Sequence, residues 1–390
     1  MGQKKNPLIY MNTPEFYDIA RSTKRGLLYE VHIADIHFGA MDPIKEYQIL
    51  YDQFILKIST LPRIDIIAIN GDIFDRKMMA NSPAIYYAIK FVSDVIAVAK
   101  IHRAAVIMTV GTPSHEAGQY NVLYQFLNDP DVEVYIVDQL KYVYTHGAKI
   151  LCIPELHNEE EAIYAQYLNG ELYDQAFGHM TFKGAVYGNN VGTGRLFCIE
   201  DFLKSRGPVI SGHVHTPGCF EKDFYYTGSP MRYKFGEEEA KGFLIVLMDL
   251  DTRRYYTHFE EITSFRYDTI ELKNIISTDP KVVIEYINDL KSKGIDYLKI
   301  KFKYIIDGSS KTIITNYYRN RNDIKLEFYD TQEEALEKAK LEQEEQSEKY
   351  SFLTDPKISD QERFVSYVNM QEGYDFISVT KLISILSDDY

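Results

Sequence analysis

The sequence has few cysteines, and this scarcity excludes one class of protein. Its 390 residues include three cysteines, Cys152, Cys198 and Cys219, and no two of them form a Cys-x-x-Cys pair. Small secreted domains that depend on disulfides carry dense, even-numbered cysteine frameworks. Three separate cysteines instead fit a reducing compartment, where we expect them to be buried or incidental.

Long apolar stretches and a hydrophobic leader are also missing. No run of about 18 apolar residues occurs, the length that a membrane-spanning helix would need. Residues 1–26 are expected to be an N-terminal extension, which carries basic side chains but lacks the apolar core of a signal peptide. We therefore expect a cytoplasmic protein that does not associate with membranes.

Positive charge is scarce relative to negative charge. Lys and Arg number 43 against 57 Asp and Glu, which gives a formal net charge of -14. Proteins that hold nucleic acid by bulk electrostatics usually show a basic surface. Any contact with nucleic acid must therefore be local, assisted by metal ions, or shared with a partner.

What the sequence does have, from residue 27 onward, is an alternation of short β-branched runs with longer amphipathic stretches. Three runs read as strands that end in polar residues, at 27–39, 64–76 and 104–116. A helix is expected over 82–100, because Ser82 can cap its first turn and Pro83 suits that turn. A second group of short strands, which begins with the segment VEVYIVD, predicts two sheets packed face to face. The pattern is typical of an α/β domain over 27–260.

Beyond residue 260 the composition changes. Residues 261–330 combine alternating apolar residues with a helix-like stretch, and they predict a small α+β domain. Residues 331–390 contain a charged helix with little apolar face, followed by a more apolar stretch. That last stretch could dock on a partner or on the protein's own domain.

Asp and His residues gather directly after the predicted strands. Two pairs with a spacing of two, Asp35 with His37 and His213 with His215, can each present both side chains on one face and hold a cation. A carboxylate that follows Gly71 could approach two cations and bridge them. The candidate ligands are Asp35, His37, Asp72, His179, His213 and His215, with His115 in a neighbouring loop. Each motif alone also occurs in ordinary polar turns, but their joint occurrence favours a metal centre.

The order Asp-x-His, Gly-Asp-x-x-Asp, a Gly-to-His loop, Gly-His and Gly-His-x-His resembles the calcineurin-like metallophosphoesterases. The segment from Tyr226 to Phe243, with Gly-Ser-Pro-Met-Arg near its start, is similar to the one that follows Gly-His-x-His in SbcD-type nuclease subunits of DNA break repair. Phage-encoded recombination nuclease subunits belong to this branch. The resemblance covers residues 27–260 and implies a four-layer α/β/β/α sandwich.

The resemblance also implies a role for each candidate. One metal would be held by Asp35, His37 and His215. The other would be held by His179 and His213, with Asp72 bridging the two. The implied cofactors are two Mn²⁺ ions, with Mg²⁺ as the alternative, and mixed nitrogen and oxygen ligation suits that choice. His115 would donate to the phosphate or protonate the leaving oxygen.

One loop departs from the family pattern. Family members read Gly-Asn-His-Asp or Gly-Asn-His-Glu, with the Asn as a metal ligand, whereas residues 111–116 read Gly-Thr-Pro-Ser-His-Glu. Aligned on His115, Ser114 stands at the Asn position, and two residues are inserted after the Gly. A hydroxyl is the poorer ligand, so we expect the second metal to bind more weakly or to use water or Glu116 instead.

The leading interpretation is a manganese-dependent exonuclease and endonuclease subunit that hydrolyses DNA phosphodiesters in recombination, repair or end processing. By resemblance, 261–330 would face DNA as a capping domain, and 331–390 would attach to an SbcC-like coiled-coil ATPase. The protein would form a homodimer, in the host cytoplasm if it is phage-encoded. Two alternatives stay open: a phosphomonoesterase or cyclic-nucleotide phosphodiesterase of the same superfamily, and a structural subunit with an impaired metal site.

Overall fold

A computed structural model describes residues 16, 26–116, 118–155, 161–185 and 196–329. Almost all of the extension expected over 1–26, and all of the region expected over 331–390, lie outside the described residues. No helix in the described ranges is long and apolar enough to cross a membrane. The chain divides into two compact units, Met1–Tyr267 and Asp268–Tyr390.

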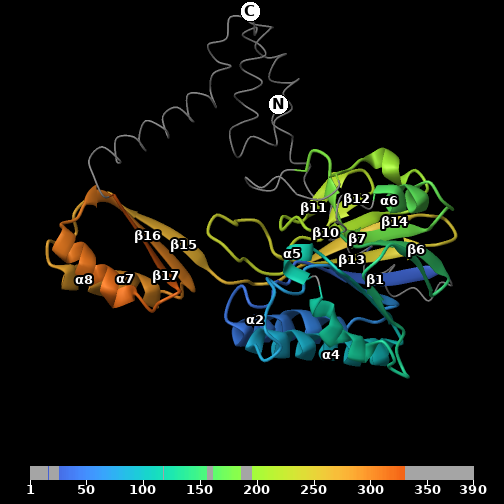
Figure 1. Ribbon diagram of the computed structural model, residues 1–390, viewed down its shortest axis with the longest axis horizontal. Coiled ribbons are helices and arrows are strands. Elements are labelled where there is room, and N and C mark those ends of the chain that lie inside the picture. The colour runs from blue at the N-terminus through green and yellow to red at the C-terminus, as the bar shows by residue number, and fades with distance from the viewer. Residues whose placement is uncertain (1–15, 17–25, 117, 156–160, 186–195, 330–390) are drawn as a thin grey trace, which may run out of the picture. The chain divides into compact units, whose positions relative to one another are not determined.

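The first unit contains two six-stranded sheets (Figure 1). In the first sheet, four neighbouring strands run parallel. A fifth strand pairs antiparallel with the outer strand of this set, and a sixth pairs antiparallel with the fifth. In spatial order these strands are β14 (Tyr255–Glu261), β13 (Gly242–Asp249), β1 (Leu27–Ile33), β2 (Ile66–Asn70), β3 (Ala105–Thr109) and β4 (Val134–Val137). Every residue of β1, β2 and β3 is buried, which explains why their sequences are largely apolar and do not alternate between apolar and polar residues.

The second sheet is built from the chain between β4 and β13. Four of its strands are parallel, and one antiparallel strand pairs at each edge. In spatial order they are β11 (Gly218–Glu221), β12 (Phe224–Tyr226), β10 (Val209–Gly212), β7 (Gln175–His179), β6 (Ala148–Ile153) and β5 (Lys141–Thr145). The segment VEVYIVD was expected in this group, but its strand β4 pairs with β3 in the first sheet.

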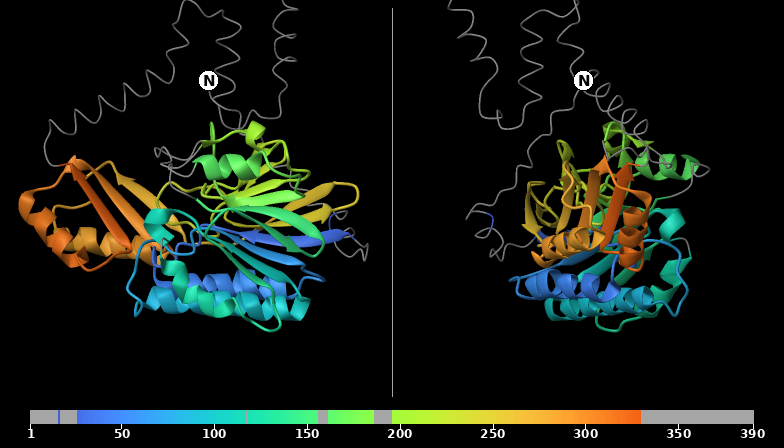
Figure 2. Two further views of the ribbon diagram at one scale, coloured as in Figure 1. Left: turned by 45° about the vertical axis from the view of Figure 1, so that its right-hand side comes forward. Right: turned by 90° about the vertical axis from the view of Figure 1, so that its left-hand side faces the viewer.

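The two sheets pack face to face around a shared apolar core. Side chains from both sheets meet in it, among them Ile66 and Ile107 from the first and Ile150 and Phe177 from the second. Helices cover the outer faces: α2 and α4 lie on the first sheet, and α6 packs on the second (Figure 2). The α/β class expected from the sequence is therefore confirmed.

One helix of the first unit begins where the sequence indicates. Helix α4 (Pro83–His102) starts after Ser82, whose hydroxyl accepts a hydrogen bond from the Ala84 amide at 3.3 Å. The expected helix over 82–100 is thus confirmed. Among the described residues of this unit, the other helical segments are α2 (Pro43–Leu50), the π-helical turn η1 (Tyr51–Ile55), α3 (Leu56–Ser59), α5 (Pro113–Glu116), the 3₁₀ segments η2 (Gln119–Phe126) and η4 (Ile199–Phe202), and α6 (Glu161–Leu168). A short pair of strands, β8 (Thr181–Phe182) and β9 (Leu196–Phe197), completes the unit.

The described part of the second unit is a three-stranded sheet with two helices. Its elements are β15 (Tyr267–Leu272), α7 (Pro280–Ser292), β16 (Tyr297–Ile305), α8 (Gly308–Tyr318) and β17 (Ile324–Tyr329). Strand β16 alternates buried and half-buried residues, because one face packs on an apolar core and the other faces solvent. Asp279 and Asp307 cap the amino ends of α7 and α8. These elements lie within the region 261–330, for which the sequence predicts a small α+β domain.

Candidate metal centre

The candidate ligands come from strands of both sheets and meet at one edge. Asp35 and Asp72 follow β1 and β2, while His179 ends β7 and His213 follows β10. Parallel strands bring their carboxyl ends to the same edge of a sheet, which is where sites form in α/β proteins. The structure brings all six together with His115, in overlapping groups whose ligand atoms lie within 4.8 Å of one another.

The backbone is strained at the residues that carry this chemistry. Asp35, His37, Asp72 and His213 have positive φ angles of 53°, 51°, 53° and 85°. Non-glycine residues rarely adopt this left-handed conformation, which costs on the order of 1–2 kcal/mol each. Strain repeated at four candidate ligands indicates that their placement, and not local stability, determines the backbone here.

Two glycines make room for the cluster. Gly71 has a φ of 89°, and a Cβ at this position would collide with the His179 ring. A Cβ on Gly212 would collide with the Asn70 carbonyl oxygen and crowd Ala34. The glycine in each Gly-Asp and Gly-His motif therefore lets neighbouring strands approach closely enough for their ligands to meet.

One half of the cluster contains Asp35, His37 and His215. The Nε2 atoms of His37 and His215 lie 3.0 Å apart. Asp35 is fully buried, and its carboxylate accepts the His213 amide at 3.0 Å, which ties the two halves together. The Nδ1 atom of His37 is buried without a hydrogen-bond partner, and Asp75 is the nearest carboxylate, at 3.9 Å.

The other half contains His179, His213 and a residue that sequence reasoning missed, Glu155. His213 Nδ1 lies 3.2 Å from His179 Nε2 and 3.3 Å from Glu155 Oε2. Asp72 lies between the halves, with Oδ2 at 3.3 Å from His179 Nε2 and 3.8 Å from His37 Nε2. Glu155 follows the apolar run of β6, so the strand-then-polar pattern was the signal that could have found it.

Two further contacts orient the imidazoles. The Asn70 carbonyl lies 2.8 Å from His179 Nδ1, and Glu237 Oε1 lies 3.3 Å from His215 Nδ1. When Nδ1 donates to such an oxygen, Nε2 is left as the free ligand nitrogen. Glu237 belongs to the segment from Tyr226 to Phe243, which also places Lys241 Nζ 3.1 Å from the His215 carbonyl. That segment is therefore a support for His215.

The loop that departs from the family pattern presents Thr112 to the cluster. The Thr112 hydroxyl lies 3.0 Å from Asp72 Oδ2, 3.2 Å from Glu155 Oε2 and 3.4 Å from His179 Nε2. Ser114, the residue expected at the Asn position, is exposed on α5. The two inserted residues explain the difference, because Thr112 directly follows the glycine.

Glu116, the expected substitute ligand, has a different partner set. Its carboxylate is fully buried and accepts the backbone amides of Ile73 and Phe74 at 2.5 and 3.1 Å and of Gly111 at 2.6 Å. The suggestion that Glu116 takes the place of the Asn is therefore wrong. Its role is to bind the loop after β2 to the loop after β3, and burial raises its pKa to about 8.

The electrostatics of the cluster depend on the balance between burial and opposite charge. Burial alone would raise the pKa of Asp72, but the nearby imidazoles of His179 and His115 hold it well below its usual range. Burial lowers the pKa of His37 to about 3, although the charge of Asp72 opposes this. His37 is therefore neutral at physiological pH, with a nitrogen lone pair available to a cation.

The donor set fits divalent cations. Imidazole nitrogens face one another at 3.0 and 3.2 Å, beside three buried or nearly buried carboxylates, from Asp35, Asp72 and Glu155. Such convergence of lone pairs and negative charge is costly unless a cation or protons occupy the space. Nitrogen and carboxylate ligands are compatible with several transition metals, so these residues do not by themselves determine the metal.

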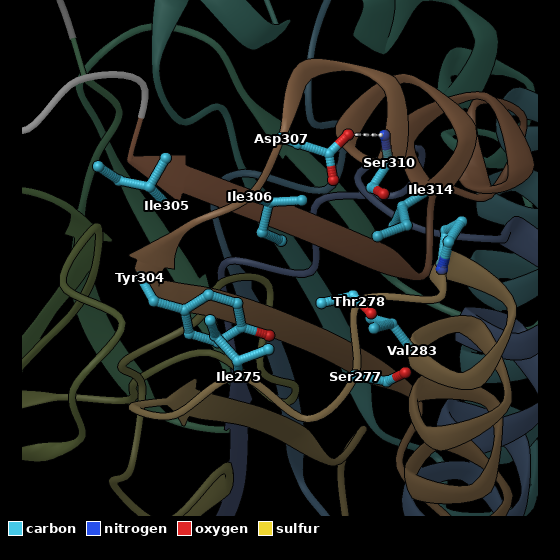
Figure 3. Close-up of a pocket in the computed structure, with 11 residues that line it drawn as sticks. Ile275, Ser277, Thr278, Val283, Tyr304, Ile305, Ile306, Asp307, Ser310 and Ile314 are labelled. Atoms are coloured by element: carbon cyan, nitrogen blue, oxygen red, sulfur yellow. Dashed lines mark hydrogen bonds between the residues drawn. The ribbon is translucent and has the colours of Figure 1, made fainter.

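A hollow in the second unit has none of this chemistry (Figure 3). It encloses about 200 Å³ between apolar residues such as Ile275, Val283 and Ile314. The carboxylate that lines it, Asp307, accepts the Ser310 amide at 2.9 Å and so caps α8. Among the described residues, every candidate metal group lies in the first unit.

Comparison with known proteins points to the same class of chemistry. No family model matches the chain. It is 24% identical over 304 residues to "Putative phosphoesterase 078R" of Invertebrate iridescent virus 3, across 71% of this chain and 75% of that protein. It is 23% identical over 197 residues to "Putative phosphoesterase 244L" of Invertebrate iridescent virus 6, across 48% of this chain and 65% of that protein. A solved structure aligns over 60% of the chain with a TM-score of 0.37 and 10% identity, too weak a similarity to define the fold.

The chain is therefore similar to distant viral proteins that are named as phosphoesterases, hydrolases that act on phosphoester bonds. The structure also has His and Asp groups at one sheet edge that could hold metal ions, as a metal-dependent hydrolysis requires.

Proposed function

We propose that the protein is a manganese-dependent nuclease subunit that hydrolyses DNA phosphodiesters with two divalent cations, and that its first unit is a four-layer α/β/β/α metallophosphoesterase sandwich. The observation that carries the proposal is the meeting of Asp35, His37, Asp72, His179, His213 and His215 around one edge. The preference for a nuclease rests on the segment from Tyr226 to Phe243, which resembles that of SbcD-type subunits and supports His215 through Glu237.

Each group has a distinct part in this reaction. Two bound cations would activate water and neutralise the phosphodiester during in-line attack. Asp35, His37 and His215 would hold one of them, and His179 and His213 would hold the other. Asp72 lies between the two sets and would bridge them.

His115 is placed to handle a proton. Its side chain is 32% exposed, so a substrate can reach it, and Nδ1 lies 3.5 Å from Asp72 Oδ2. The nearby Asp72 carboxylate raises the pKa of His115, although burial opposes this. A protonated imidazole at this position can donate to a phosphate oxygen or protonate the leaving oxygen.

The partners that we propose follow from charge and resemblance. The formal net charge of -14 favours shared binding of DNA, because the chain has no surplus of cations to hold the polyanion alone. We assign the 261–330 region a DNA-facing capping role and the 331–390 region attachment to an SbcC-like coiled-coil ATPase. A homodimer in the cytoplasm, which is the host cytoplasm if the protein is phage-encoded, completes the proposal.

A substrate panel tests the function. The purified full chain would be incubated with Mn²⁺, Mg²⁺ or chelator on linear duplex DNA, single-stranded DNA, bis(p-nitrophenyl) phosphate, p-nitrophenyl phosphate and a cyclic nucleotide. The proposal expects Mn²⁺-dependent cleavage of DNA that is lost in His115→Ala and Asp72→Asn. Cleavage of monoester or cyclic nucleotide alone would support the alternative enzymes, and absence of both metal binding and hydrolysis would support a structural subunit.

A further inference from the structure

Glu155 differs from the other members of the cluster because it belongs to none of the motifs that carry the family resemblance. It follows β6, the strand next to β7, and its side chain is 10% exposed. Its Oε2 atom lies 3.3 Å from His213 Nδ1 and 3.7 Å from His179 Nε2. A single carboxylate oxygen thus faces the ligand nitrogens of two histidines on two neighbouring strands.

Thr112 fixes the position of this carboxylate. Its hydroxyl lies 3.2 Å from Glu155 Oε2 and 3.0 Å from Asp72 Oδ2, while its amide donates to Asp72 Oδ1 at 2.7 Å. A hydroxyl has one proton, so it can donate to one of these carboxylates while its lone pairs remain beside the other. A second donor at this place, such as a cation, would satisfy both carboxylates together.

We propose that Glu155 is a metal ligand of this chain, and that its carboxylate, with His179, His213 and Asp72, holds the second divalent cation in place of the amide ligand that the resemblance leads one to expect. Thr112 is a positioning residue that holds Glu155 and Asp72 in register. This inference rests on the proposed function, since it concerns the same site.

The replacement has a chemical consequence. A carboxylate adds one negative charge where an amide adds none, so Asp35, Asp72 and Glu155 bring three charges to two divalent cations. Anionic oxygen ligands favour hard cations such as Mn²⁺ and Mg²⁺. The second site of this chain should therefore bind Mn²⁺ firmly, and not weakly as a serine at the amide position would imply.

Metal binding, and not hydrolysis, provides the test. Metal-free full chain would be titrated with Mn²⁺ while free Mn²⁺ and the signal of spin-coupled Mn²⁺ pairs are followed by electron paramagnetic resonance. The variants are Glu155→Ala, Glu155→Gln and the matched control Glu171→Gln, whose carboxylate is 81% exposed and pairs with Lys149. Circular dichroism of each metal-free variant would check that it is folded.

We expect two bound Mn²⁺ ions and a coupled spectrum for the wild-type chain and for Glu171→Gln. Glu155→Ala should bind one ion with an uncoupled spectrum. Glu155→Gln keeps an oxygen but loses the charge, so its second ion should bind more weakly by at least about 10-fold to 100-fold, the loss that supporting residues alone can cause. Thr112→Val should weaken the binding of the second ion. Thr112→Ser keeps the hydroxyl, so it should bind the second ion as the wild-type chain does.

The outcomes separate the two proposals. If the wild-type chain binds fewer than two ions, the metal site of the proposed function fails. If the wild-type chain and a folded Glu155→Ala variant both bind two coupled ions with equal affinity, Glu155 is not a ligand, and the inference fails alone.

Discussion

The two units of the chain differ in the types of residue that they bury. The core of the second unit is apolar, with Ile287, Leu298 and Ile300 fully buried. Its charged groups pair near the surface, as where Arg321 binds Asp323 through two hydrogen bonds of 2.8 Å. The first unit has a similar apolar core between its sheets but also buries carboxylates and imidazoles at one edge.

This difference shows where selection for function acts. Burying ionisable groups costs free energy, and so do left-handed backbones at four non-glycine ligands. A fold selected for stability alone would not concentrate both at one sheet edge. The second unit shows neither feature in its described residues.

Asp72→Asn should have the largest effect, which should be confined to the metal site of the first unit. Asp72 approaches ligand nitrogens in both halves of the cluster, so removal of its charge should weaken both cations. We expect hydrolysis to fall to the level of the chelator-treated wild-type chain, while the second unit remains folded. Metal analysis and activity assays check this, and a variant with full metal content and full activity would contradict the account.

His115→Ala should separate chemistry from metal binding. Because His115 is assigned to proton transfer, its loss should lower kcat by about 10²-fold to 10⁴-fold. The number of bound cations should stay at the wild-type value. If single-turnover rates on DNA do not change, His115 has no part in the reaction.

Ile287→Ala should destabilise the second unit and leave metal binding by the first unit unchanged. This residue is fully buried in the core of the second unit, so the truncation should destabilise that unit by about 2–5 kcal/mol. Val282→Ala, on the same helix but 42% exposed, is the control and should change stability by less than about 0.5 kcal/mol. Chemical denaturation measures both, and a loss of bound metal in Ile287→Ala would show that the units are not independent.

The pH dependence of stability should also distinguish the units. Burial raises the pKa of Glu46 to about 7, although its carboxylate accepts the amides of Gly39 and Met41. As pH rises from about 4.5 to 7, Glu46 ionises first in the unfolded state, so Glu46 alone lowers the stability of the first unit by on the order of 3 kcal/mol. Glu116, whose pKa burial raises to about 8, adds a loss of the same sign. Asp307 and Asp323 have lowered pKa values, so they are ionised in both states throughout this window.

Glu46→Gln should therefore reduce the slope of the pH dependence of the first unit's unfolding, without affecting the second unit. Denaturation of the metal-free chain at several pH values measures this, with Glu171→Gln as the control. An unchanged pH profile in Glu46→Gln would show that Glu46 is not the source of the effect.

The sequence predicts local features, such as helix caps and strands, better than it predicts which strands pair with one another. The cap at Ser82 and the apolar runs of β1, β2 and β3 are written in neighbouring residues, and these predictions are confirmed. Strand β4 was placed in the wrong group, because an apolar run does not reveal which strand it will pair with.

The same limit applies to the candidate site. The six candidate ligands follow recognisable motifs, and the structure brings them together, while their role as ligands stays a prediction. Glu155 and Glu237 were missed because the sequence does not show which histidine each of them contacts. Glu155 lies beside His213, and Glu237 lies beside His215. The insertion in the Gly-to-His loop hid Thr112 in the same way, since alignment on His115 drew attention to an exposed serine.

The central claim is that this sheet edge holds two cations. Anomalous scattering at the manganese edge, from crystals of the wild-type chain grown with Mn²⁺, tests it most directly. The account predicts two peaks, one among Asp35, His37 and His215 and one among Glu155, His179 and His213, each close to Asp72. A cluster with no peak, or with a single peak at saturating Mn²⁺, would contradict it.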